Sequence, residues 1–85
     1  MAIEMLYFAW VREQVGVGQE TIDPPPEVAT VGTLIDWLAT TSPGHQAAFA
    51  ERHRLRAAVD QRFVSMDDPL GTPREVALFP PVTGG

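Results

Sequence analysis

Alternating side chains at the start of the chain predict a β-strand over residues 3–11. The segment is rich in aromatic and aliphatic residues and lacks helical periodicity, which favours an extended backbone. Successive side chains of a strand point to opposite faces, so one face would carry Ile3, Met5, Tyr7 and Ala9 and the other Glu4, Leu6, Phe8 and Trp10. Both sets are largely apolar. One face would therefore meet the core, and the other would need a covering helix or another protein.

A turn and a second strand are predicted next. Residues 12–15 are too few for more than one or two helical turns before the turn Gly16-Val17-Gly18. Residues 19–22 predict a short strand that pairs with the first as a hairpin, and the three prolines at 24–26 would end it.

An apolar stripe predicts the main helix. Its members recur at spacings of three and four residues and would pack over the sheet; they are Val31, Leu34, Ile35 and Leu38, with Trp37 at the edge of the stripe. Either Thr30 or Thr33 would cap this helix, and in the second case Asp36 would complete a capping box.

A second, shorter helix is predicted over residues 45–54. The tripeptide Ser42-Pro43-Gly44 would stop the main helix before it. Ala48 and Phe49 would face inward, and the charged residues would lie in solvent, namely Glu51, Arg52 and Arg54. These arginines are interpreted as a solvated face.

The rest of the chain predicts three more strands. Residues 55–59 and 62–64 would form a tight hairpin around Asp60-Gln61, and residues 67–73 a loop. In a last strand over residues 75–79, Val76 and Leu78 would face the core, while Ala77 and Phe79 would face outward. The order of elements, with one long helix and no βα repeat, predicts an α+β fold.

An outward apolar set follows from these registers, comprising Leu6, Phe8, Trp10, Phe63 and Phe79. Apolar groups on one contiguous exposed face usually mark a protein interface. Two alternatives stay open: a second helix covers this face, or a register shift of one residue exchanges inside and outside.

Composition narrows the function classes. Eighty-five residues with no cysteine make one domain that must be held by packing alone, without disulfides or thiolate metal sites. A net charge of -5 argues against a nucleic-acid partner. The apolar start of the chain contains Glu4, lacks a basic leader and is too short to cross a bilayer. We therefore expect a cytoplasmic protein without a membrane partner.

Catalytic side chains are hard to identify. His45 and His53 are expected to be surface histidines, and no metal site is expected. Asp67 and Asp68 precede a proline and indicate turn chemistry. Neither Ser42 nor Ser65 lies in a nucleophile motif.

The C-terminal segment 80–85 offers a different chemistry. Gly84 and Gly85 carry no Cβ, so this end could enter a channel too narrow for other residues. Pro80 and Pro81 favour an extended arm, reaching about 18 Å over six residues. The arm would leave the domain, residues 1–79, directly from its last strand. The alternative is an ordinary frayed terminus.

The segment Phe79-Pro80-Pro81-Val82-Thr83-Gly84-Gly85 resembles the C-terminal signature of the small subunit of molybdopterin synthase, a sulfur carrier with the ubiquitin-like β-grasp fold. Further similarity spans nearly the whole chain, in the stretches 6–9, 12–13, 57–61, 64–65 and 69–70. The resemblance implies a mixed sheet of four to five strands with central, parallel first and last strands, one main helix across one face and one short extra helix.

The resemblance also implies a chemistry for the tail. An ATP-dependent activating enzyme would adenylate the carboxylate of Gly85, and a sulfur donor would convert it to a thiocarboxylate. Pro80, Pro81, Val82, Thr83 and Gly84 would insert into the large subunit of a heterotetrameric synthase, where a pyranopterin precursor receives the sulfur and becomes the molybdopterin dithiolene. Phe8, Phe63 and Phe79 match positions expected to pack against that subunit, which would supply the catalytic side chains. The chain itself would bind no cofactor.

Two positions depart from the family pattern. Asp60 stands where asparagine is common, and residues 71–74 replace an acidic turn. Two other functions remain open: a sulfur carrier of a thiamine or amino-acid pathway, and a non-covalent ubiquitin-like interaction module.

Overall fold

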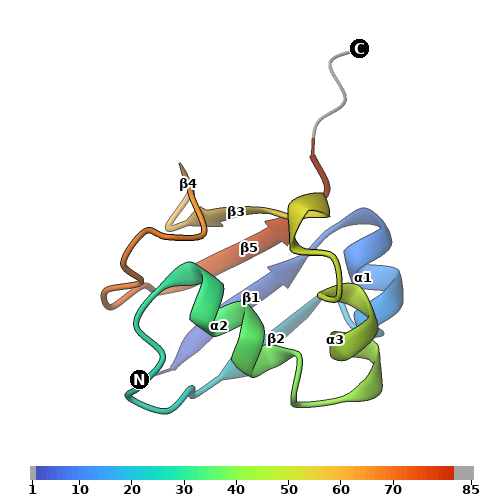
Figure 1. The fold of residues 1–85 in the computed structure, drawn as a ribbon, viewed down its shortest axis with the longest axis horizontal. Coiled ribbons are helices and arrows are strands. Elements are labelled where there is room, and N and C mark those ends of the chain that lie inside the picture. The colour runs from blue at the N-terminus through green and yellow to red at the C-terminus, as the bar shows by residue number, and fades with distance from the viewer. Residues whose placement is uncertain (1, 82–85) are drawn as a thin grey trace.

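The computed structural model of the chain describes residues 2–81. The predictions for Val82, Thr83, Gly84 and Gly85 lie outside the described residues. Five strands form one mixed sheet (Figure 1) in the order β2-β1-β5-β3-β4. Their bounds are β1 Ile3–Tyr7, β2 Gln19–Ile22, β3 Arg56–Val59, β4 Arg62–Val64 and β5 Glu75–Phe79. β1 and β5 are parallel, and the other neighbours are antiparallel. The central parallel pair confirms the expected topology.

The helices gather on one side of this sheet. Figure 1 shows α2, Val31–Leu38, crossing in front of the strands with α3, Pro43–Ala48, beside it. α1, Ala9–Val15, packs against α3, and a short 3₁₀ helix, η1, covers Arg52–Arg54. Within the described residues, no helix has the length and apolar character needed to cross a bilayer.

The core lies between the helices and the sheet, and it uses the alternation seen in the sequence. Ile3, Met5 and Tyr7 of β1 are buried, as are Val76 and Leu78 of β5. The predicted stripe on α2 is confirmed, because all four of its residues are fully buried, namely Val31, Leu34, Ile35 and Leu38. Trp37 is partly buried at the edge of the stripe. The strand registers are therefore those predicted, with no shift of one residue.

The predicted strand over residues 3–11 is too long, because β1 ends at Tyr7 and a helix begins at Ala9. Ala9 has φ of 54°, a left-handed conformation that breaks the extended run. The carbonyl of Phe8 accepts hydrogen bonds from the N–H groups of Val11 and Arg12, which opens α1. Aromatic residues on both sides of the break concealed it. Trp10 and Val11 consequently belong to a helix.

The boundary between the second and third helices was also predicted wrongly. The tripeptide Ser42-Pro43-Gly44 opens α3 instead. The Ser42 hydroxyl accepts a hydrogen bond from the N–H of His45 and caps the helix. Pro43 stands in the first turn, where a backbone N–H would have no partner within the helix, so its missing N–H costs nothing. Gly44 permits close packing on α1, since a Cβ there would lie 2.6 Å from the carbonyl oxygen of Gln14. The predicted helix over 45–54 is two pieces, α3 and η1. Ala48 and Phe49 are buried as expected.

The caps and turns follow simple local rules. Thr30 caps α2, and Thr33 rather than Asp36 completes the capping box. Asp60 and Gln61 have φ of 48° and 69°, the positive values that a two-residue β3–β4 hairpin needs. The Asp60 Oδ1 also accepts from the N–H groups of Arg74 and Glu75, at 2.9 Å and 3.0 Å. The predicted hairpin is confirmed, and its first residue is tied to the start of β5.

Candidate functional site

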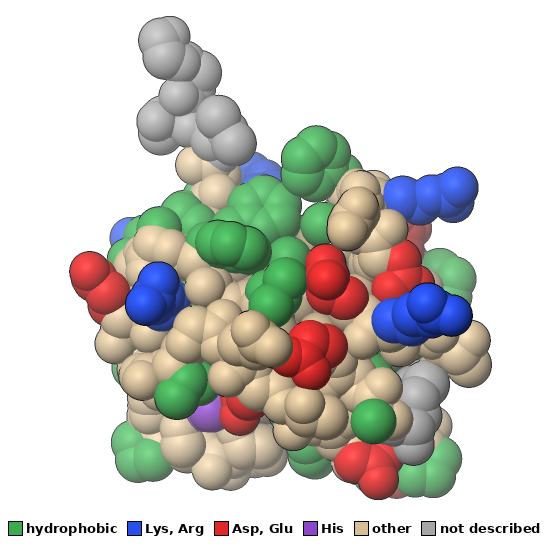
Figure 2. All heavy atoms as spheres, turned by 180° about the vertical axis from the view of Figure 1, so that it is seen from behind, with side chains coloured by type: hydrophobic (Ala, Val, Ile, Leu, Met, Phe, Trp, Pro, Cys, Tyr) green, Lys and Arg blue, Asp and Glu red, His purple; other side chains and the backbone are tan. Residues whose placement is uncertain are grey.

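The face of the sheet turned away from the helices is uncovered. The strand registers place Leu6 beside Ala77, Ala77 beside Ala58, and Ala58 beside Phe63. Figure 2 shows this face, with hydrophobic side chains gathered in its upper part and acidic side chains nearer the middle. The two alanines make a low floor between larger apolar groups. No helix of the described residues 2–81 lies over this floor, so the first alternative for the outward set is not realised there.

Three phenylalanines border the open face at its tail end. Phe8 is 49% exposed and Phe63 is 84% exposed, which is unusual for such large apolar side chains. The rings of Phe63 and Phe79 are in contact, with centroids 5.9 Å apart. In the parallel pair of β1 and β5, Tyr7 lies opposite Leu78. The next residues along the two chains, Phe8 and Phe79, are therefore also neighbours. The structure thus brings Phe8, Phe63 and Phe79 together. Their role as a partner interface stays a prediction.

Two members of the outward set behave differently. Leu6 is largely buried between its strand neighbours. Trp10 lies on α1 rather than on β1, is partly buried against the core, and carries the Arg54 guanidinium over its ring at 4.7 Å from the centroid. The open apolar face is therefore formed by the phenylalanines, Leu6 and the alanine floor.

The C-terminal segment begins in the middle of the sheet. β5 is hydrogen-bonded to β1 on one side and to β3 on the other, so Phe79 is held at the end of a central strand. Pro80 and Pro81 follow it directly and are partly exposed. Neither proline can continue the strand ladder, because proline has no N–H to donate. The chain therefore leaves the domain from a rigid position beside Phe8 and Phe63.

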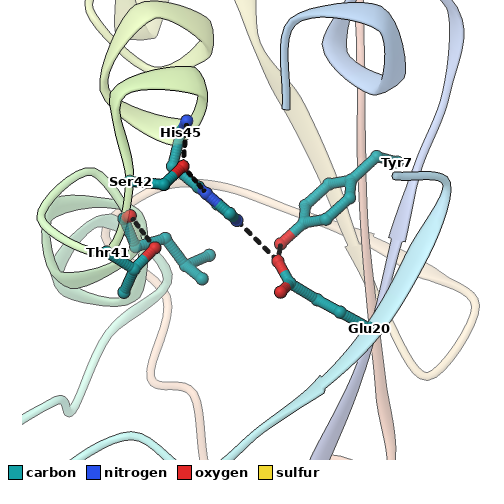
Figure 3. Close-up of polar contacts among 6 residues, drawn as sticks. Tyr7, Glu20, Thr41, Ser42 and His45 are labelled. Atoms are coloured by element: carbon teal, nitrogen blue, oxygen red, sulfur yellow. Dashed lines mark hydrogen bonds and ion pairs between the residues drawn. The ribbon is translucent and has the colours of Figure 1, made fainter. Parts of the chain in front are cut away.

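A polar cluster on the helical side of the sheet was not predicted. His45, expected at the surface, is only 7% exposed. Its Nε2 lies 2.6 Å from the Glu20 carboxylate and its Nδ1 2.6 Å from the Ser42 hydroxyl (Figure 3). The Tyr7 hydroxyl donates to the same Glu20 oxygen at 2.6 Å. The cluster joins α3 to β1 and β2. The contact between Ser42 and His45 could have been found from the sequence, because a helix-capping serine stands three residues before the histidine.

These contacts shift the ionisation of Tyr7 and Glu20. Burial, and then the hydrogen bond to the Glu20 carboxylate, raises the pKa of Tyr7 far above its ordinary value. Burial alone would raise the pKa of Glu20, but the hydrogen bonds from Tyr7 and His45, together with the charge interaction with His45, lower it below 4.5. Ser42 caps α3 and contacts a buried imidazole, so its hydroxyl serves the fold. The cluster is a structural clamp.

Other sites for ligands are shallow. A groove of about 620 Å³ lies beside Phe8 and is lined in part by Leu6, Arg12 and Gly18. Within residues 2–81, no three His, Asp or Glu side chains come together as a metal site would require. His53 is exposed on η1. Of the described residues, the open face and the root of the C-terminal segment are the best candidates for function.

Comparison with known proteins identifies the family of this chain. The model of the ThiS family matches residues 5–85. A molybdopterin synthase sulfur carrier subunit of Escherichia coli is 43% identical over 83 residues, covering 98% of this chain and 99% of the relative. One from Homo sapiens is 35% identical over 86 residues, covering 98% and 93%.

Solved structures agree with the fold. A putative molybdopterin converting factor, subunit 1, from Pyrococcus furiosus has a TM-score of 0.76 at 32% identity, covering 96% of this chain and 99% of that one. SAMP1 from Haloferax volcanii has a TM-score of 0.72 at 26% identity, with both chains fully covered. The α+β architecture is thus that of the ubiquitin-like β-grasp proteins.

Proposed function

This chain belongs to the ThiS family, and we propose that it is the sulfur carrier subunit of a molybdopterin synthase in molybdenum cofactor biosynthesis. The observation that carries the proposal is the direct continuation of central strand β5 into a C-terminal segment beside three clustered phenylalanines. Similarity over nearly full length to molybdopterin synthase sulfur carrier subunits supports it.

The reaction takes place at the carboxylate of Gly85. In an activating enzyme, a carboxylate oxygen attacks the α-phosphorus of ATP and pyrophosphate leaves. A donor that supplies sulfur at the oxidation level of sulfide then attacks the acyl carbon through that sulfur, AMP leaves with the carboxylate oxygen, and a thiocarboxylate remains. Two thiocarboxylates in turn bond their sulfur to carbons of a pyranopterin precursor, and water cleaves each resulting thioester, which restores the Gly85 carboxylate. The two sulfur atoms together make the dithiolene of molybdopterin. Adenylation is needed because a free carboxylate is a poor electrophile.

The large subunit of the synthase would bind both the open apolar face and the C-terminal segment of this chain. Pro80, Pro81, Val82, Thr83 and Gly84 would enter its active site, while Phe8, Phe63 and Phe79 pack outside. Phe8 is 49% exposed and Phe79 is already partly buried in the free chain, so less than three whole rings remain to be buried. At about 25 cal/mol per Å² and about 150 to 250 Å² per aromatic ring, this contributes about 5 to 10 kcal/mol. Ordering six tail residues costs about 1 to 2 kcal/mol each. The aromatic contacts can therefore offset a large part of the cost of ordering the tail.

Deleting Gly85 tests the role of the tail. We expect the shortened chain to keep the thermal unfolding midpoint of the full chain but to gain no sulfur. Intact mass measured after incubation with ATP, a sulfur donor and the activating enzyme should show the oxygen-to-sulfur increment in the full chain alone. Reactions without ATP are the matched control. A shortened chain that still supports molybdopterin formation would refute the tail chemistry.

A carrier of another sulfur pathway is the alternative, since the matching family model carries the name ThiS. The two are separated by giving the thiocarboxylated chain a choice of acceptors. Conversion of the pyranopterin precursor to molybdopterin supports our proposal, and sulfur reaching only a thiazole or an amino acid would replace it. If no activating enzyme produces a thiocarboxylate on this chain, the remaining function is a non-covalent interaction module.

A further inference from the structure

Basic side chains are concentrated where the C-terminal segment leaves the domain. The chain has eleven acidic and six basic residues, yet three of its six arginines fall in the five residues 52–56. Arg56 is the register partner of Phe79, the residue before the two prolines. Figure 1 shows η1, in yellow, beside the end of β5. The segment that was interpreted from sequence as a solvated face is thus at the root of the C-terminal segment.

The three arginines of this segment have different environments. Arg52 points to the helical side and forms an ion pair with Asp36, so its charge is used within the fold. Arg54 is exposed, and its one carboxylate contact in the described structure is Glu51, at 3.7 Å. Arg56 is exposed and has no carboxylate within 4 Å among the described residues. Arg54 and Arg56 therefore carry positive charge that the domain leaves largely uncompensated.

Both guanidinium groups are held in place. The Arg56 Nη1 donates to the carbonyls of Leu55 and His53, at 2.8 Å and 3.2 Å. The Arg54 guanidinium stacks on the Trp10 ring. A side chain already held by the fold loses less conformational entropy when a partner binds it. Arg56 lies opposite Phe79, at the border of the hydrophobic group in the upper part of the open face. The result is an apolar patch with a fixed basic rim.

We propose that Arg54 and Arg56 form a basic rim that docks against carboxylate groups on the protein surface that receives the C-terminal segment. This inference rests on the proposed function, because it assumes that the segment enters a partner. Charges at the rim of an interface act mainly on the association rate and on the choice and orientation of partners. Here they would orient the carrier so that the root of its tail faces the part of the partner that binds the tail.

The test reverses the charge of the rim. We expect Arg54→Glu/Arg56→Glu to slow association with the large synthase subunit by about tenfold or more at low salt. Stopped-flow measurements at about 0.1 M and about 1 M salt should show the difference shrinking, because the Debye length falls from about 10 Å to about 3 Å. The matched control is Arg62→Glu/Arg74→Glu, which makes the same charge change at exposed positions away from Phe79.

Charge and geometry are separated by Arg56→Lys, which keeps the charge and should keep the association rate. Thermal unfolding of every variant checks that Arg54 on Trp10 is not needed for folding. The rim is refuted if both double variants slow association equally, or if neither does. It is also refuted if association is unchanged but ATP-dependent adenylation weakens, which would assign the arginines to nucleotide phosphates. Failure of the unsubstituted chain to bind the large subunit would instead count against the proposed function.

Discussion

The two faces of the sheet use the same strands for different purposes. On the helical face, Ile3, Met5 and Leu78 are fully buried with the α2 stripe. On the open face, Ala58 and Ala77 are themselves buried between larger neighbours, but Phe63 is almost fully exposed. An apolar residue buried within the fold stabilises the fold, whereas one left exposed can stabilise only a complex. The comparison therefore divides the apolar residues of this chain into those that stabilise the fold and those that remain available to a partner, which the proposed function assigns to docking.

The largest effect should come from the helical face. Leu34→Ala removes a fully buried side chain from α2 and leaves a cavity. We expect the free energy of unfolding to fall by about 2 to 5 kcal/mol, measured by urea denaturation. The part of the sample that remains folded should still bind the large subunit normally. A loss below about 0.5 kcal/mol would mean that α2 is not the main cover of the sheet.

The opposite pattern is expected on the open face. Phe63→Ala should change the free energy of unfolding by less than about 0.5 kcal/mol, because the ring is exposed in the free chain. It should weaken the complex by about 2 kcal/mol, as aromatic residues at the centre of an interface commonly do. Calorimetric titration with the large subunit measures the second quantity. If Phe63→Ala binds the large subunit normally but has a lower free energy of unfolding, Phe63 stabilises the fold rather than the complex, and our assignment of the open face is wrong.

A smaller, pH-dependent effect is expected at the Tyr7–Glu20–His45 clamp. The pKa of Glu20 is lower in the folded chain than its ordinary value of 4.5. Its ionised form therefore stabilises the fold above that value, and the contribution is lost as the pH falls through the folded-state pKa. Urea denaturation of Glu20→Gln should therefore show a shallower loss of stability than the unsubstituted chain as the pH falls below about 4.5.

Glu27→Gln removes an exposed carboxylate and is the matched control for this measurement. Parallel curves for the unsubstituted chain and Glu20→Gln would contradict a stabilising role for the ionised Glu20. Tyr7→Phe should leave the His45 contact in place and retain part of the pH dependence, since the second hydrogen bond to Glu20 remains.

Local patterns in the sequence determined much of the fold. Period-two alternation identified the buried residues of β1 and β5, and spacings of three and four identified the face of α2. The Asp60-Gln61 turn was predictable because few residue pairs suit the positive φ of a tight hairpin. The exposed phenylalanines followed from the same alternation, once the strand registers were correct. These features depend on near neighbours along the chain, which is why one sequence was enough.

Other features were decided only in the tertiary structure. The left-handed Ala9 that ends β1 has no sequence signature, because alanine seldom adopts this conformation. His45 can be buried because Glu20 pairs with its ring nitrogen and Tyr7 donates to the same Glu20 carboxylate. Both partners come from strands distant from His45 in the sequence. Arg56 lies opposite Phe79 because the sheet pairs β3 with β5, and Arg54 on η1 lies over the Trp10 ring of α1. Each depends on contacts between segments far apart in the chain, which periodicity cannot report.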